Sequence, residues 1–290
     1  MRVILLHNVK AGNQEWPAGR LKRLFAKHGH KVVYVSTKDG NWEEGLKQSA
    51  QAVAIAGGDG TVGLVALRVA QRKLPFCVLP VGTANNIATS LEHDYAPEKI
   101  VAGLAAASEK KLDLGTVTSC RGSSPFIESV GAGILGEMTQ MPKQKDSASI
   151  AKKLKRARKH LVSMLDDYDG FEGEVLLDGK RTKGRFLAVE IMNIDRIGPN
   201  LLLAPKADTS DGWLDAVCIT TRDREKLRSY LKAGDNMASP FQVKRCRRAE
   251  LRCSGAQIHV DDKPIDIPSA KIHLQRAALR FLDCDPQALS

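Results

Sequence analysis

An aspartate lies among three glycines at residues 57–61, which read Gly-Gly-Asp-Gly-Thr. The stretch follows an apolar run and precedes apolar residues at helical spacing, so it predicts a turn between a strand and a helix. Glycine lets the backbone approach a ligand closely, and a helix start offers free N–H groups that favour phosphate. Asp59 would repel phosphate unless a cation or a reacting hydroxyl lay between them. The pattern indicates phosphoryl chemistry, with Asp59 accepting a proton or holding a magnesium-bound water. The plain alternative is an aspartate chosen for turn geometry.

Two familiar phosphate motifs are compared with this stretch. The G-x-x-x-x-G-K-[ST] motif is absent, which excludes a Walker-type NTPase. Residues 58–63 match G-x-G-x-x-G, but a dinucleotide fold needs an acidic residue about 20 positions further on to hold the ribose. No acidic residue occurs between Asp59 and Glu92. This absence disfavours a nicotinamide-dependent oxidoreductase.

Two more glycine loops follow predicted strands, at residues 79–88 (LPVGTANNIA) and 7–13 (HNVKAGN). In the first of these, Gly82 shapes the turn, and Thr83 and Asn85 supply hydrogen-bond donors. The carboxyl ends of parallel strands meet at one edge of a sheet, where open α/β folds bind ligands. We therefore expect the three loops to converge on one crevice.

The elements that must position these loops change character near residue 115. Before it, short apolar runs alternate with amphipathic segments, which predicts a mostly parallel α/β sheet. Thr61 is expected to cap the helix that follows, on which Val62, Val65 and Val69 share one face. After residue 115, alternating runs predict antiparallel strands, interrupted by helices around 148–168 and 222–234.

Length and composition limit the classes of protein. A chain of 290 residues is long enough for two domains. The net charge of +11 favours an anionic partner: nucleotide phosphates, an acidic membrane surface or nucleic acid. No apolar run approaches the length of a membrane span, and the apolar part of the N-terminus is too short for a signal peptide. The six scattered cysteines are expected to be reduced thiols of a cytoplasmic protein.

The paired motifs G-G-D-G-T and P-x-G-T-x-N resemble the diacylglycerol kinase catalytic family, which includes bacterial lipid kinases and sphingosine and ceramide kinases. The resemblance extends over most of the chain. Residues 7–12 resemble the family's N-P-x-S-G at Asn8 and Gly12. Residues 112–115 (LDLG) resemble the end of its nucleotide domain, and residues 191–215 resemble its N-x-x-x-x-G…P-x-A…D-G-x-L-D run.

The resemblance implies an α/β fold: a Rossmann-like nucleotide domain over 1–116 with a mostly parallel sheet, and an antiparallel β-sandwich-like lipid-substrate domain over 117–290. It implies ATP and Mg²⁺ as cofactors, and transfer of the γ-phosphoryl group to a lipid hydroxyl in the cleft between the domains. A structural Mg²⁺ is expected at Asp211, with Asp113 at a second acidic position; the alternative for Asp211 is a plain Asp-Gly turn. The residues expected to hold ATP are Asn8, Gly12, Gly57, Gly58, Asp59, Gly60, Thr61, Gly82, Thr83 and Asn85.

The sequence departs from the family pattern at several positions. Leu64 and Asn86 replace an expected Glu and Asp. Residues 260–264 read V-D-D-K-P where bacterial relatives have V-D-G-E-P, so Lys263 stands in place of the proposed general base and Asp262 in place of the glycine. The catalytic candidates are therefore Asp59, Asp262 and Asp261. The alternative is a catalytically impaired member that binds nucleotide or lipid.

The segment 143–165 combines eight Lys and Arg residues with an apolar stripe at helical spacing. Such a helix can lie on anionic lipid; the alternative is a surface helix packed by its stripe, with solvated charges. No aromatic residues interleave with the charges, so nucleic acid is not an expected partner. The expected partners are ATP and a lipid presented by an anionic membrane surface, and the expected location is the cytoplasm with transient membrane association. The sequence leaves a homodimer open.

Overall fold

The computed structural model describes residues 1–139, 148–234 and 237–285. The chain forms two compact units, one from residues 1–112 together with the C-terminal segment from Ala277, the other from Asp113 to Arg276. Both unit boundaries fall inside long strands, β5 (Ser108–Ser119) and β17 (Ser269–Asp283). The sequence predicted a single division after residue 116. The structure instead assigns residues 277–285 to the first unit.

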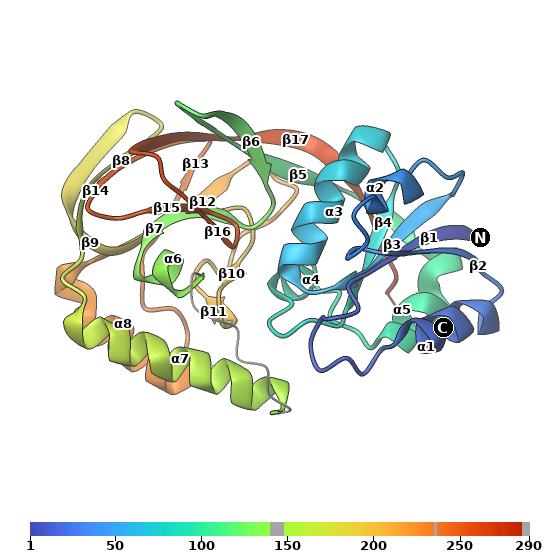
Figure 1. Cartoon of the computed structure of the whole chain (residues 1–290). Coiled ribbons are helices and arrows are strands. Elements are labelled where there is room, and N and C mark those ends of the chain that lie inside the picture. Colours follow the sequence, from blue (N-terminus) through green and yellow to red (C-terminus); the bar gives the residue numbers. More distant parts are fainter. Residues whose placement is uncertain (140–147, 235–236, 286–290) are drawn as a thin grey trace. The chain divides into compact units, whose positions relative to one another are not determined.

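The first unit contains a parallel sheet with the strand order β17-β4-β3-β1-β2 (Figure 1). All six residues of β3 are buried, as expected for a central strand covered on both faces. The strands are β1 (Arg2–His7), β2 (Lys31–Ser36), β3 (Ala52–Gly57) and β4 (Phe76–Pro80).

The helices of the first unit follow its strands, as the sequence predicted. Val62, Val65 and Val69 of α3 are buried, which confirms the expected apolar face. The prediction that Thr61 caps this helix is wrong, because the helix begins two residues earlier with Gly58 as the N-cap. The helices are α1 (Ala18–Lys27), α2 (Trp42–Gly45), α3 (Asp59–Arg72), α4 (Asn86–Ser90), α5 (Pro97–Gly103) and the short η1 (Leu104–Ala106).

The second unit is built on antiparallel strands in the order β16-β15-β7-β9-β8-β14-β17. The long strand β9 (Lys180–Met192) pairs with β8 through its first half, with β7 through its second half, and with β12. This one strand thereby pairs with three others of the unit. The remaining strands are β6 (Gly122–Phe126), β7 (Ser129–Gly133), β8 (Phe171–Leu177), β10 (Arg196–Ile197), β11 (Leu201–Leu202), β12 (Leu214–Thr220), β13 (Val243–Cys246), β14 (Arg248–Ser254), β15 (Ile258–Val260) and β16 (Lys263–Ile265).

Helices α7 (Ile150–Asp167) and α8 (Arg224–Ala233) lie side by side in the second unit (Figure 1). Leu161 and Leu165 of α7 belong to a buried cluster that also includes Leu227 of α8. Residues 143–147 of the predicted basic segment lie outside the described residues. The unit also has α6 (Ile134–Thr139) and the short η2 (Thr221–Asp223).

The predicted fold class, a parallel α/β part followed by an antiparallel β part, is confirmed. All six cysteines are free thiols. Within residues 1–139, 148–234 and 237–285, no helix is both long enough and apolar enough to cross a membrane.

Candidate functional site

The three glycine loops of the first unit meet at the carboxyl ends of β1, β3 and β4. A Cβ atom at Gly82 would lie 2.3 Å from the Cα of Gly58, so the loops that follow β3 and β4 touch backbone to backbone. Gly12 has a φ of +53°, and a Cβ there would lie 2.3 Å from the carbonyl oxygen of Val81. Only glycine fits at these contacts. The expected convergence of the loops is therefore present within this unit.

Asn8 connects the first loop to the second. Its side-chain Nδ2 donates to Thr61 Oγ1 at 2.9 Å, and its backbone N–H donates to the carbonyl of Ala56 at 2.9 Å. Its Oδ1 accepts the backbone N–H of Lys10 at 3.1 Å. Thr61 is thus held by a neighbouring loop instead of capping its own helix.

Asn85 shapes the loop after β4. Its φ is +54°, in the left-handed region that asparagine tolerates. Its Oδ1 accepts the backbone N–H of Gly82 at 2.9 Å, and its Nδ2 donates to the carbonyl of Pro80 at 3.2 Å. The side chain therefore fixes the turn, and Thr83 lies within that turn.

Asp59 joins the loop after β3 to the helix after β4. Its Oδ1 accepts the backbone N–H of Ile87 at 2.9 Å. Burial raises the pKa of Asp59, while hydrogen bonds from the amides at the start of α4 oppose the rise. The carboxylate thus contacts the N-terminus of α4, and Asp59 itself is the first residue of α3.

This arrangement can bind a polyphosphate. The first amides of α3 have no acceptor within the helix, and the helix dipole places partial positive charge there. Gly57, Gly58 and Gly60 keep side chains out of the approach. An anchored carboxylate beside such an anion site suits proton transfer or the support of a cation.

In the second unit, Asp261 and Asp262 form the turn between β15 and β16. The Asp261 carboxylate accepts backbone N–H groups from Ile127 (3.2 Å), Glu128 (2.8 Å) and Ser129 (3.3 Å). Burial raises the pKa of Asp261 to about 6, against the lowering effect of these amides. Its oxygens hold the turn in place. Asp262 and Lys263 are exposed.

The structure brings Asp113 to the loop that carries Asp211. Asp113 is buried, and its Oδ2 accepts the backbone N–H of Gly212 at 2.7 Å. Asp211 Oδ1 accepts the backbone N–H of Trp213 at 2.9 Å, and its Oδ2 forms an ion pair with Arg245. Both carboxylates are therefore engaged by donors of the protein itself.

Two residues at this loop were not among the site candidates from the sequence: Asp215, the last residue of the D-G-x-L-D match, and Arg245. Asp215 is 2% exposed, and burial raises its pKa to about 6. Its Oδ2 has no hydrogen-bond partner in the described part of the chain. Asp215 lies opposite Arg245 in the pairing of β12 with β13, and the Arg245 Nε is 4.0 Å from its Oδ1. No signal in the sequence specified this cross-strand register.

These residues fit a structural magnesium poorly, because Arg245 already supplies the positive charge at Asp211. Within the described ranges, no group of three or more His, Cys, Asp or Glu side chains is arranged to hold a metal ion. The magnesium site at Asp211 and Asp113 therefore stays a prediction, and no chemical step is derived from it.

Chelation tests this disagreement. We expect EDTA to leave the melting temperature of the wild type unchanged and Arg245→Met to lower it, because Asp215 then loses its nearest cation. A loss of about 1 kcal/mol corresponds to about 2–4 °C in a protein of this size. Differential scanning fluorimetry with EDTA or Mg²⁺ is the measurement. A fall in the wild-type melting temperature on chelation, absent in Asp211→Ala, would restore the magnesium site.

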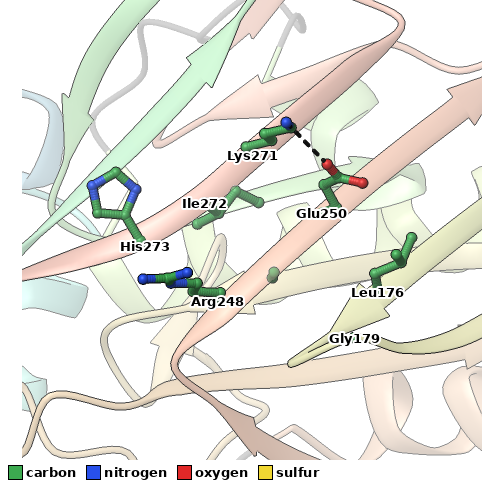
Figure 2. Close-up of a pocket in the computed structure, with 8 residues that line it drawn as sticks. Leu176, Gly179, Arg248, Glu250, Lys271, Ile272 and His273 are labelled. Carbon is green, nitrogen blue, oxygen red and sulfur yellow. Dashed lines mark ion pairs between the residues drawn. The ribbon is translucent and has the colours of Figure 1, made fainter.

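A shallow groove lies elsewhere in the second unit, over β8, β14 and β17 (Figure 2). Figure 2 shows Lys271 paired with Glu250, a contact of 3.6 Å, with Arg248 and His273 further along the groove. None of the residues singled out from the sequence lines it. The groove is therefore separate from the candidate site residues.

Sequence comparison decides the family. The profile of the diacylglycerol kinase catalytic domain matches residues 2–117, and that of the YegS C-terminal NAD kinase beta sandwich-like domain matches residues 129–282. The chain belongs to the diacylglycerol kinase family. It is therefore a member of a family of kinase enzymes, as its paired glycine motifs indicated.

Two bacterial relatives show how far the likeness extends. A protein of Pseudomonas aeruginosa named "Probable lipid kinase YegS-like" is 26% identical over 96% of this chain and 92% of its own length. A diacylglycerol kinase of Mycobacterium tuberculosis is 23% identical over 82% of this chain and 78% of its own. The family relationship thus includes both units.

Solved structures support the fold. The crystal structure of a diacylglycerol kinase from Bacillus anthracis matches with a TM-score of 0.72 and 15% identity, over 97% of this chain and 96% of that one. An NAD kinase from Archaeoglobus fulgidus in complex with ATP matches with a TM-score of 0.55 and 12% identity, over 100% and 96%. At these identities the likeness establishes the fold alone.

Proposed function

We propose that this chain transfers the γ-phosphoryl group of ATP to a hydroxyl group of a lipid. The observation that supports it is the convergence of three glycine loops on Asp59 in a member of a kinase family. The choice of a lipid, diacylglycerol-like or sphingoid, follows from relatives named lipid kinase and diacylglycerol kinase.

In this proposal the first turn of α3 would hold the ATP phosphates, and a Mg²⁺ ion bound with them would supply positive charge for the transfer. Gly57, Gly58, Gly60 and Gly82 allow the close approach, and Gly12 lets the first loop close on the third. Asn8 and Asn85 hold the loops in position through their side-chain hydrogen bonds. Thr61 and Thr83 are the further proposed contacts of the nucleotide. Asp59 orients the nucleotide's magnesium or accepts a proton. Positioning and charge stabilisation supply most of the rate in such transfers.

On the acceptor side, the two carboxylates singled out from the sequence, Asp261 and Asp262, are not equivalent. Asp261 accepts backbone amides with its oxygens, so its role is to hold the turn. Exposed Asp262 remains the candidate for taking the proton of the lipid hydroxyl.

The second candidate function is a member that binds nucleotide or lipid without transferring phosphate. Exposed Lys263, at the position of the family's proposed base, favours it. Transfer of labelled phosphate from ATP to a panel of diacylglycerol, sphingoid and ceramide lipids separates the two functions. No labelled product, together with thermal stabilisation by ATP–Mg²⁺, would support the binding protein. Stabilisation by NADPH but not by ATP would overturn both.

Helix α7 supports transient binding of the protein to an anionic membrane surface. Its apolar residues Leu161 and Leu165 pack inside the unit, so these two are not free to enter a bilayer, whereas Ile150 is exposed. Arg158 is also buried and donates to the carbonyls of Pro199 and Asn200. The exposed basic side chains of α7 are those of Lys152, Lys155, Arg156 and Lys159. We propose that these four residues attract the protein transiently to anionic lipid.

Replacing these four residues by glutamine is expected to reduce sedimentation with anionic vesicles at least about 10-fold, since each basic residue near the surface contributes about 1 kcal/mol. Added salt should weaken wild-type binding similarly, because charges are screened within about 8 Å at physiological ionic strength. A matched control replaces the exposed lysines Lys27, Lys31, Lys99 and Lys111, which removes the same charge elsewhere. Equal loss in both variants would mean that net charge, and not α7, drives binding.

A further inference from the structure

Three residues form a row across neighbouring strands of the second unit. His259 of β15 lies opposite Gly131 of β7, which lies opposite Glu190 of β9. Gly131 has no side chain, and a Cβ there would lie 2.3 Å from Glu190 Oε2. The two outer side chains therefore meet over the middle strand, with His259 Nε2 3.0 Å from Glu190 Oε1.

The pair is fully enclosed. Glu190 is 0% and His259 4% exposed. Ser129 Oγ donates to Glu190 Oε2 at 3.2 Å. A Cβ at Gly136 of α6 would lie 2.7 Å from His259 Cδ2, so that helix closes over the ring. Buried polar groups persist only when their hydrogen bonds are made, which they are here.

The contacts determine the charge of the ring. His259 Nδ1 lies 2.9 Å from the carbonyl oxygen of Asp261, which can only accept, so Nδ1 carries a proton. An ionised Glu190 also only accepts, so Nε2 carries a proton too. Burial alone would lower the pKa of His259, but the charge and hydrogen bond of Glu190 raise it above its ordinary value. The stabilising effect of the pair is present at acid pH and is lost as the pH rises through this raised pKa.

The pair is attached to the turn at Asp261 and Asp262. His259 holds the carbonyl of Asp261, and Ser129 accepts the backbone N–H of Asp261 at 2.8 Å. The Asp261 carboxylate is fixed by the amides of residues 127–129. The turn residue is thus held through its N–H, its carbonyl and its side chain, and Asp262 follows directly after it.

We propose that Ser129, Glu190 and His259 are positioning residues for the turn at Asp261 and Asp262, which we call the acceptor-side turn. In this network His259 is an imidazolium. They do not touch the reacting atoms; they fix the backbone from which Asp262 reaches the lipid hydroxyl. This inference rests on the proposed function, because Asp262 acts only if a hydroxyl is phosphorylated.

Ring ¹⁵N chemical shifts of the histidines in the full-length protein test the charge without any enzyme assay. At pH 7.5 we expect both nitrogens of His259 to be protonated in the wild type. Glu190→Gln should convert His259 to a neutral ring and speed amide exchange at residues 261–263. The control variant His273→Gln, which removes an exposed histidine of the same unit, should change neither.

Kinetics test the positioning role. Glu190→Gln is expected to lower kcat by about 10- to 100-fold, the range caused by misplacing a catalytic group by about 1 Å. The KM for ATP should stay within about twofold, because the nucleotide loops belong to the other unit. Glu172→Gln, at an exposed carboxylate of β8, should leave both constants unchanged.

Each failure has a separate signature. A neutral His259 in the wild type would overturn the imidazolium, whether or not Glu190→Gln folds. A neutral ring in Glu190→Gln with unchanged kcat would overturn the positioning role. A charged ring and slow amide exchange in a wild type that phosphorylates no lipid would leave the network intact and refute the proposed function alone.

Discussion

Asp59→Asn is expected to slow phosphoryl transfer at least about 100-fold and to leave the melting temperature nearly unchanged. Asparagine keeps an oxygen that can accept the backbone N–H of Ile87, so the link from α3 to α4 survives. It removes the negative charge that would accept a proton or support the nucleotide's magnesium. Labelled-phosphate transfer and scanning fluorimetry measure the two effects separately.

Asp59→Ala provides the comparison. Alanine cannot accept the Ile87 amide, so this variant should lose activity and also melt at a lower temperature. The exposed Asp39→Asn is the matched control and should behave as the wild type. Wild-type turnover in Asp59→Asn would mean that the carboxylate serves only to connect the two loops.

Lys263→Glu combined with Asp262→Gly is expected to raise the rate of transfer by about 10-fold, within the range that a general base supplies. The double change restores the loop of bacterial relatives. Both residues are exposed, and Asp261 keeps its backbone contacts, so the turn should stay in place. Initial rates at saturating ATP, with KM values for ATP and lipid, are the measurements.

The single variants separate the effects. Asp262→Gly alone should lose most activity, because it removes the carboxylate proposed to accept the proton of the lipid hydroxyl. Loss of activity with weaker ATP binding in the double variant would show that Lys263 holds phosphate as a point charge. An unchanged rate in the double variant would place this turn outside the chemistry.

The fold was predictable from the sequence because its main signals are local. Apolar runs that each end in a glycine loop specify parallel strands, and the Asp-Gly step at Asp178 and Gly179 specifies the turn between β8 and β9. The error at Thr61 has a simple physical cause. The helix begins at Asp59, so Thr61 lies inside its first turn, where its hydroxyl accepts a hydrogen bond from Asn8, a residue distant in sequence.

The acceptor-side network could not be predicted from the sequence. Glu190 and His259 are far apart in the chain, and they meet only because a glycine separates them in a three-strand register. Asp261 looked like a catalytic candidate for the same reason, since its amide donors come from residues 127–129. Pairing between distant strands decides which carboxylates are available, and local patterns carry no information about it.

The return of β17 to the first unit affects how this protein can be made. Phe281 pairs with Phe76 of β4, and Leu282 and Cys284 belong to the core of the first unit. Domains usually fold in order as they leave the ribosome, but the first unit lacks a strand until the part of β17 from Ala277 to Asp283 is synthesised. Until then the edge of β4 is unpaired and open to association with other chains. A truncation before Ala277 would therefore damage the first unit, although the missing residues lie far in sequence from the rest of that unit.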